Sequence, residues 1–198
     1  MKNICLASWD FSFVGGISNV VSSLSEEFSK RYNTHVLSIN DENNKLGANL
    51  SEKVKYYVIN KGTNRVRNAC VKSFFPILKY LKKNKIDIVF GVGHYTGPVL
   101  LPVSKFSKAK FVFCDHGAIA NQLDDFTAVS FRKSAAKHFD KIITLTTRNR
   151  DDYIKMFNCQ EDKVICIPNW VDSKVIKCAS AQYDIASKKI IIYSGKRV

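Results

Sequence analysis

Apolar residues in this chain follow two alternating patterns. Short, nearly continuous apolar runs are typical of strands that are buried on both faces of a parallel sheet. Between several of these runs, apolar residues recur every three or four positions, which is typical of helices with one buried face. Strands are predicted at 2–8, 35–40, 53–60, 86–93, 110–117, 141–146, 163–169 and 189–195. Helices are predicted around the apolar positions 17–28 and over 66–83, 131–139 and 148–157.

The order of these elements predicts the fold class. Strands that alternate with helices form a Rossmann-like, doubly wound, mostly parallel α/β sheet with helices on both faces. Pro76 is expected to kink the 66–83 helix or to restart it, because proline lacks the N–H group that the helix needs. The polar stretch 121–127 is expected to be a mobile connection.

The connections at the carboxyl ends of the strands form the predicted site. Ligands of doubly wound sheets bind beyond those ends, in the crevice that the loops make. Four segments follow predicted strands and are expected to share this rim: Gly15-Gly16, 91–95, 115–117 and Thr146-Thr147.

The last predicted strand, at 189–195, begins like the first strand of a further α/β unit. A strand with two apolar faces needs neighbouring elements to cover it, and only three residues follow. We therefore expect residues 1–186 to form one Rossmann-like domain and residues 187–198 to be the first strand of a second domain.

Composition indicates an ordinary globular protein with a strong positive charge. Hydrophobic residues make up 45% of the chain, which excludes a disordered chain, and the formal net charge is +14. Such a charge attracts nucleic acid, anionic lipid headgroups or a phosphorylated substrate. Because no helix-turn-helix, RNP-type or zinc-finger pattern is present, nucleic acid is not expected as a partner, whereas an anionic membrane surface fits. The basic residues concentrate at 61–67, 79–85, 105–110 and 132–141.

The cysteines and the N-terminus indicate a cytoplasmic location. No C-x-x-C pair occurs, and several cysteines lie inside apolar runs, which favours free thiols over disulfides. The first apolar stretch is too short for a signal peptide, and no apolar run approaches the roughly 20 residues that span a bilayer. Any membrane contact is therefore expected to be peripheral. The cysteines are Cys5, Cys70, Cys114, Cys159, Cys166 and Cys178.

Two glycines lie between the first strand and the first helix. Gly15 and Gly16 would let a phosphate or a sugar approach the backbone, and the helix N-terminus offers unpaired N–H groups and a positive dipole. The alternative is that they serve only a tight turn. The pattern is not G-x-G-x-x-G, so a dinucleotide site is weakly supported.

Histidines follow two of the predicted strands. His116, between Asp115 and Gly117, could donate to a substrate hydroxyl or stabilise developing charge, and the alternative is a structural histidine satisfied by the backbone. His94 and Tyr95 lie at the equivalent place after the neighbouring strand and could line the same crevice. No H-x-x-x-H, cysteine cluster, P-loop or G-x-S-x-G pattern is present, so a metal site, a P-loop nucleotidase and a serine hydrolase lack support.

The ordered set of segments resembles the N-terminal half of a family 4 glycosyltransferase of GT-B architecture, in which two Rossmann-like domains face each other across a cleft. The run 167–172, which precedes a fresh strand, is the most specific and is similar to the family's interdomain crossover. The segments are Gly15-Gly16-Ile17, IDIVFGVG, FVFCDHG, DKIITLTTRNRDDY from Asp140, VICIPNWVD from Val164 and IIIYSGKRV from Ile190.

The resemblance implies transfer of a sugar from a nucleotide sugar to an acceptor hydroxyl with retention of configuration and without a cofactor or a required metal. It implies that Gly15 and Gly16 approach the donor phosphates and the acceptor. It also implies that His116 touches the donor sugar as the catalytic residue, and that Lys196 or Arg197 helps to bind the diphosphate. With the rim positions His94, Tyr95 and Asp115, these are the candidate substrate-binding residues.

The function expected from these patterns is synthesis of a surface polysaccharide or glycolipid at the inner face of the cytoplasmic membrane, with a glycan or lipid-linked acceptor. Donor binding would need the C-terminal domain that is missing here. The alternatives are a non-catalytic or partner-dependent half-enzyme and, with less support, a Rossmann oxidoreductase.

Overall fold

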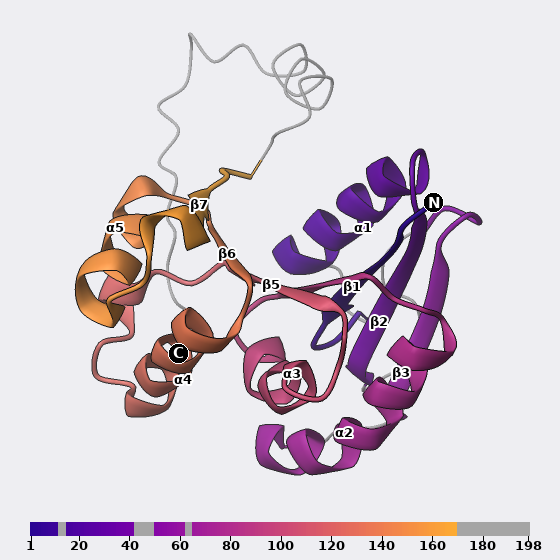
Figure 1. Cartoon of the computed structure of the whole chain (residues 1–198), viewed down its shortest axis with the longest axis horizontal. Coiled ribbons are helices and arrows are strands. Elements are labelled where there is room, and N and C mark those ends of the chain that lie inside the picture. The colour runs from indigo at the N-terminus through magenta and orange to yellow at the C-terminus, as the bar shows by residue number, and fades with distance from the viewer. Residues whose placement is uncertain (12–14, 42–49, 62–64, 170–198) are drawn as a thin grey trace, which may run out of the picture. The chain divides into compact units, whose positions relative to one another are not determined.

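Within the residues that the structure describes, seven strands pair into one sheet in which every pairing is parallel. The computed structural model describes residues 1–11, 15–41, 50–61 and 65–169, and Met1–Pro168 form one compact unit (Figure 1). The strand order is β3-β2-β1-β4-β5-β6-β7, which confirms the predicted Rossmann-like sheet. The strands are β1 (Asn3–Ser8), β2 (Asn33–Asp41), β3 (Lys55–Lys61), β4 (Ile88–Val92), β5 (Lys110–Asp115), β6 (Lys141–Thr144) and β7 (Val164–Cys166).

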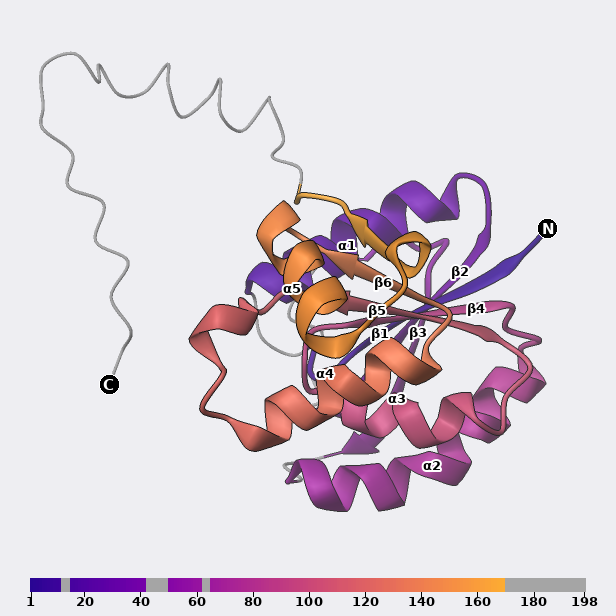
Figure 2. The same ribbon diagram turned by 60° about the vertical axis from the view of Figure 1, so that its left-hand side comes forward.

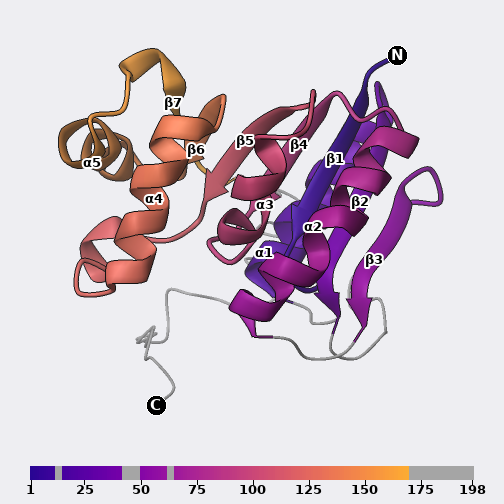
Figure 3. The ribbon, with the colours of Figure 1, turned by 60° about the horizontal axis from the view of Figure 1, so that its bottom comes forward.

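Helices cover the two faces of the sheet unequally. In the described part of the chain, α1 (Gly16–Ser29) lies against one face and four helices lie in a row against the other (Figures 2 and 3). Right-handed crossovers explain this division. From β1 the chain moves along the sheet towards the β3 edge, and from β4 it moves towards the opposite edge at β7, so the connecting helices lie on opposite faces. The row consists of α2 (Val66–Lys83), α3 (Thr96–Ser104), α4 (Phe126–His138) and α5 (Thr147–Phe157); the short 3₁₀ helices are η1 (Ile119–Asn121) and η2 (Glu161–Lys163).

The two covered faces explain the continuous apolar runs. On β1, Leu6 packs into the cluster that contains Val21 of α1, while Cys5 and Ala7 belong to the cluster beneath α2 to α5. Alternate side chains of one strand thus enter two different cores. Fully burying a large aliphatic side chain such as Leu6 contributes about 1.5–3 kcal/mol, so both faces of the strand stabilise the sheet.

Helix α3 is absent from the sequence-based prediction. Its nine residues are almost all apolar or small and include two prolines, so neither a helical nor a strand period is visible. Gly97 explains why the helix can pack closely on α4. A Cβ atom at Gly97 would lie 1.7 Å from the Phe131 ring, which leaves no room for any side chain there.

Helix α4 begins at Phe126, five residues earlier than the predicted start at Phe131. The side chain of Asp125 caps it by accepting hydrogen bonds from the N–H groups of Thr127 and Ala128 at 2.9 and 3.0 Å. The predicted connection 121–127 therefore overlaps helical elements at both ends, η1 at Asn121 and α4 at Phe126 and Thr127, and the cap of α4 lies within it.

Helix α2 continues through Pro76 and does not restart there. Proline removes the hydrogen bond that the Lys72 carbonyl would accept, at a cost of about 3 kcal/mol. Ile77 and Leu81 lie beyond the proline and are buried in the core, and their burial offsets that loss.

Five cysteines of the described chain are free: Cys5, Cys70, Cys114, Cys159 and Cys166. Burial raises the pKa of the Cys5 and Cys114 thiols to about 12, so both remain protonated and unreactive. The predicted strand at 189–195, the predicted domain boundary after 186, and Cys178 lie outside the described residues.

Candidate functional site

Three loops meet at the carboxyl edge of the sheet. The Gly93 N–H after β4 donates to the Cys114 carbonyl of β5 at 3.1 Å. A Cβ atom on Gly93 would lie 2.8 Å from Cδ1 of Ile17 in α1, and the Trp9 and Tyr95 rings lie 5.7 Å apart. The predicted rim therefore brings the connections after β1, β4 and β5 together.

The glycine loop leaves the N-terminus of α1 open. Gly15 is the N-cap in an extended conformation, and no described side chain caps the helix. No other atom of the described residues lies within 4 Å of the Cβ positions of Gly15 and Gly16, and both residues are exposed. The first N–H groups of a helix have no carbonyl partner within it, so this end presents donors and a positive dipole to a ligand at the rim.

His94 and Tyr95 form an aromatic pair on the neighbouring connection. Their ring centroids lie 3.8 Å apart; His94 is half-buried, and Tyr95 is 48% exposed. Burial, together with the positive charge of Arg132, lowers the pKa of His94 below its ordinary value of 6.5. At neutral pH this imidazole is therefore uncharged, and the pair presents one polar and one apolar ring at the rim.

Asp115 is fully buried, and its carboxylate bonds to groups inside the protein. Oδ2 accepts from Nε of Arg132 at 2.6 Å and from the Tyr153 hydroxyl at 2.8 Å, while Oδ1 accepts from the Gly117 N–H at 2.9 Å. Arg132 is also fully buried, and it donates a further hydrogen bond to Gln122 at 2.6 Å. This geometry favours a role for Asp115 in positioning the loop, and its contact with substrate stays a prediction.

A second anchor holds the loop that carries His116. The Asn149 amide donates to the Gly117 carbonyl at 2.7 Å and accepts from the Ile119 N–H at 3.3 Å. Asn149 is itself fixed in the first turn of α5, where its N–H donates to the Thr146 hydroxyl that caps the helix. The loop is thus held from α4 by Arg132 and from α5 by Asn149.

His116 lies half-buried between these two anchors. Burial lowers the pKa of His116, and the negative charge of Asp115 opposes this shift. A neutral imidazole carries one N–H donor and one acceptor nitrogen, so His116 can hydrogen-bond a sugar hydroxyl without an added positive charge. The other two histidines lie away from the rim: His35 is buried and hydrogen-bonds Tyr80 at 2.9 Å, and His138 is exposed at the end of α4.

Arg132 and Asn149 are functional-site residues that the sequence analysis misses. Arg132 falls within the basic segment 132–141, where it looks like one of several solvated charges. Asn149 follows the capping residue Thr146 by three positions, which is a local signal for a helix start and not for a loop anchor. Both contacts depend on residues from different elements, so no local pattern reveals them.

The described residues can also be searched for a metal site and for a membrane-spanning helix. Among the described residues, no group of three or more histidine, cysteine or acidic side chains could hold a metal ion. No described helix combines the length and the apolar character that crossing a membrane requires. The candidate residues Lys196 and Arg197 lie outside the described residues, so their contacts stay predictions.

The sequence of this chain matches one protein family over most of its length. The family described as Glycosyltransferase Family 4 matches residues 14–175, which include α1 and every connection of the rim except the first part of the β1 loop. No curated protein sequence is significantly similar to the chain.

Solved structures share the fold. Sucrose-phosphate synthase from Thermosynechococcus elongatus is 14% identical with a TM-score of 0.70, and the match covers 92% of this chain and 52% of that one. The lipopolysaccharide outer core galactosyltransferase WaaB, in its apo form, is 14% identical with a TM-score of 0.65, covering 86% and 46%. The UDP-GlcNAc 2-epimerase from Methanocaldococcus jannaschii is 17% identical with a TM-score of 0.63, covering 85% and 46%.

At these identities the likeness shows the fold alone, and the chain spans about half the length of each of these three proteins. The family match is independent of them and covers well over half of the chain. The chain therefore belongs to glycosyltransferase family 4 and has the fold of the N-terminal half of a GT-B enzyme.

Proposed function

We propose that this chain is the acceptor-side part of a retaining glycosyltransferase that moves a hexose-type sugar from a nucleotide-sugar donor to an acceptor hydroxyl. The observation that carries the proposal is that two features lie at the carboxyl edge of one parallel sheet: the N-terminus of α1, which no described side chain caps, and the half-buried His116 after β5. Family membership supports the same reaction class.

The chemistry of sugar transfer fits these groups. As the bond between the anomeric carbon and the donor phosphate breaks, negative charge gathers on the departing diphosphate. The N–H groups and dipole at Gly16 of α1 favour negative charge nearby, and Lys196 or Arg197 would add a positive charge. His116 would bind a hydroxyl of the donor sugar and hold it in place as the bond breaks.

The proposed acceptor is a glycan or a lipid-linked glycan, in the synthesis of a surface polysaccharide or glycolipid at the inner face of the cytoplasmic membrane. The net charge of +14 supports an anionic setting for this acceptor. No metal is assigned a part in the reaction.

A donor screen with the native full-length protein tests the proposal. The protein is incubated with a panel of nucleotide sugars and a lipid or glycan acceptor extract, and mass spectrometry follows the release of nucleoside diphosphate and the mass gain of the acceptor. We expect one donor to yield both products. Failure of every common nucleotide sugar to react would contradict the proposal.

A partner-dependent half-enzyme is the second candidate, because the chain spans about half the length of the similar structures. Calorimetric titration of the 198-residue chain separates the two. Binding of an acceptor glycan without binding of a nucleotide sugar, in a native protein no larger than this chain, would favour the half-enzyme.

A further inference from the structure

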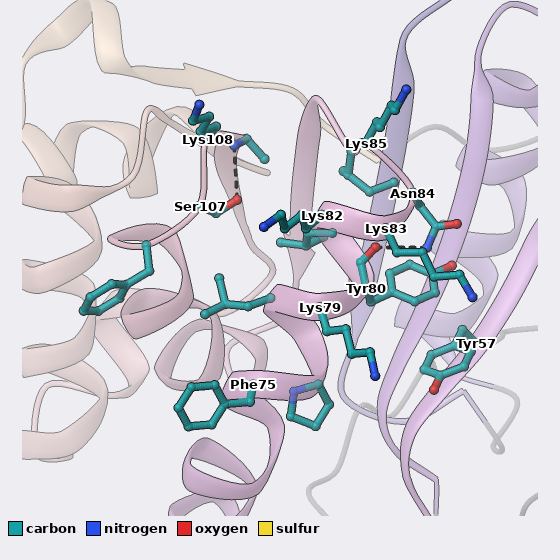
Figure 4. Close-up of a pocket in the computed structure, with 16 residues that line it drawn as sticks. Tyr57, Phe75, Lys79, Tyr80, Lys82, Lys83, Asn84, Lys85, Ser107 and Lys108 are labelled. Atoms are coloured by element: carbon teal, nitrogen blue, oxygen red, sulfur yellow. Dashed lines mark hydrogen bonds between the residues drawn. The ribbon is translucent and has the colours of Figure 1, made fainter.

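A hollow lies on the opposite side of the fold from the rim, near the amino ends of β4 and β5. It is bounded by the C-terminal half of α2 and by the connection between α3 and β5 (Figure 4). Lys85 and Ile86 lie within three residues of the start of β4, and Lys108 and Ala109 directly precede β5, which fixes the position of the hollow at this edge. None of the candidate site residues that the structure describes lines it.

Exposed phenyl rings form one side of this hollow. Phe75 is 76% exposed and Phe106 is 71% exposed, and both line it. The half-buried Phe74 joins them, because its ring centroid lies 5.0 Å from that of Phe75 and 5.5 Å from that of Phe106. Val71, one turn before Phe75, is equally exposed. Three connected rings at the surface of a soluble domain mark an interaction site more often than chance exposure does.

Lysines line the same hollow as these rings. Figure 4 shows the ammonium groups of five lysines spread around the hollow, and none of them takes part in a salt bridge among the described residues. The sequence from 65 to 114 contains a single acidic residue, Asp87, whose carboxylate accepts from the Asn3 N–H at 2.7 Å. Within the described part of the chain, no acidic side chain pairs with the positive charge of the hollow. The five lysines are Lys79, Lys82, Lys83, Lys85 and Lys108.

We propose that these five lysines, Phe75 and Phe106 form a docking surface for an anionic lipid bilayer. We call it the lysine–phenylalanine surface. Its phenyl rings would enter the boundary between headgroups and acyl chains, while the lysines would attract anionic headgroups at the same depth. Long lysine side chains suit this arrangement, because a lysine can place its apolar stem at the boundary of the acyl chains while its charge stays in the headgroup layer.

Other occupants fit the surface less well. A second copy of the chain would bring five more lysines against these five and would be repelled. Nucleic acid sites favour arginine, whose planar group binds phosphates and bases through two hydrogen bonds, and no arginine is among the described residues that line the hollow. A lipid surface needs only point charges and apolar rings, which are the groups present.

Vesicle sedimentation tests this inference, which does not rest on the proposed sugar transfer. The full 198-residue chain is mixed with vesicles of phosphatidylcholine alone or with about one-third phosphatidylglycerol, at low and high salt. We expect binding to the anionic vesicles only, weakened by salt. Replacing Lys79, Lys82, Lys83 and Lys85 with Gln should weaken it by at least about tenfold. The double change Phe75→Ser and Phe106→Ser should also weaken it by about tenfold, with less effect of salt on the loss.

A charge-matched variant provides the control. It replaces Lys2, Lys53, Lys133 and Lys155, which are exposed and lie outside the hollow, with Gln. This variant should retain binding to within about threefold, and far-ultraviolet circular dichroism should show the same helix content in all variants. Equal losses in both lysine variants, or no binding to anionic vesicles, would overturn the proposal. Tighter binding to single-stranded RNA than to vesicles, lost in the same lysine variant, would overturn it in favour of a nucleic acid.

Discussion

At the carboxyl ends of β4 and β5, the charges of Asp115 and Arg132 are buried and paired, whereas on the lysine–phenylalanine surface near the amino ends of the same strands the charges are exposed and all positive. The buried pair fixes the loop that carries His116. The exposed lysines fix nothing inside the protein. Charge at one edge therefore maintains the geometry of the loop, while charge at the other edge is available to an outside partner. Substitutions should therefore affect stability at the first edge and binding at the second.

The largest effect on stability is expected from Asp115→Ala. The change leaves the buried Arg132 guanidinium without its counter-charge and the Tyr153 hydroxyl without its acceptor, so we expect a loss of about 3–5 kcal/mol in the free energy of unfolding. Urea denaturation of the chain measures this. The control Asp124→Ala removes an exposed carboxylate and should change stability by less than about 0.5 kcal/mol. A loss below about 1 kcal/mol for Asp115→Ala would show that the pair does not hold the loop.

A smaller loss is expected from Gly97→Ala. The new Cβ atom would collide with the Phe131 ring, so α3 and α4 must separate, at a cost of about 1–3 kcal/mol. The control Gly16→Ala meets open space at a helix start and should be neutral or slightly stabilising in the same urea experiment. Equal effects of the two changes would contradict the tight contact between α3 and α4.

Gly93→Ala should cost about 1–2 kcal/mol and should loosen the contact between the β4 connection and α1. Gly93 has a φ of +88°, which strains any other residue, and its new Cβ atom would press on Ile17. Shortening that neighbour in the double variant with Ile17→Val should recover part of the loss, as thermal unfolding can show. A double variant no more stable than Gly93→Ala alone would mean that the strain lies only in the backbone.

Acidification should lower the free energy of unfolding through the two histidines at the carboxyl edge. Burial lowers the pKa values of His94 and His116 in the folded protein below their ordinary value of 6.5, so protons bind more tightly to the unfolded chain. Their contribution to stability is complete above that ordinary value and is lost as the pH falls through the folded pKa values. The free energy of unfolding should decrease from pH 7.5 to pH 5, and less steeply after His94→Gln and His116→Gln. An unchanged slope in that double variant would assign the effect to other groups.

The smallest effect on stability is expected at the opposite edge. Replacing Lys79, Lys82, Lys83 and Lys85 with Gln removes no salt bridge of the described chain, so the free energy of unfolding should change by less than about 0.5 kcal/mol for each lysine and should rise slightly as repulsion falls. A clear destabilisation in urea would show that these lysines serve the fold, which would remove the contrast between the two edges.

Patterns along the chain predict the sheet well, because a strand buried on both faces is a local apolar run. IDIVFGVG and FVFCDHG are such runs, and they correspond to β4 and β5. The rim also follows from the sequence, since parallel strands end at the same edge. Helix α3 does not follow, because its sequence lacks a polar face that would reveal the period.

The internal structure of the site could not be predicted in the same way. Arg132 pairs with Asp115 across seventeen residues, and Asn149 reaches Gly117 across thirty-two. Such contacts depend on how α4 and α5 pack on the sheet, and no residue near Arg132 distinguishes it from the exposed Lys133. The same limit applies to the lysine–phenylalanine surface, since Phe106 comes close to Phe74 only when α3 packs beside α2.

The most direct test of the proposed active edge is the turnover of the native full-length protein after His116→Ala, with His138→Ala as the matched control. Both changes remove one imidazole, but His138 is exposed at the end of α4, away from the rim. With the donor identified in the screen, the account predicts that His116→Ala lowers kcat by at least about tenfold while unfolding in urea changes little, and that His138→Ala leaves kcat unchanged. Equal kcat values for the His116→Ala variant and the unaltered protein would contradict the assignment of sugar transfer to this edge.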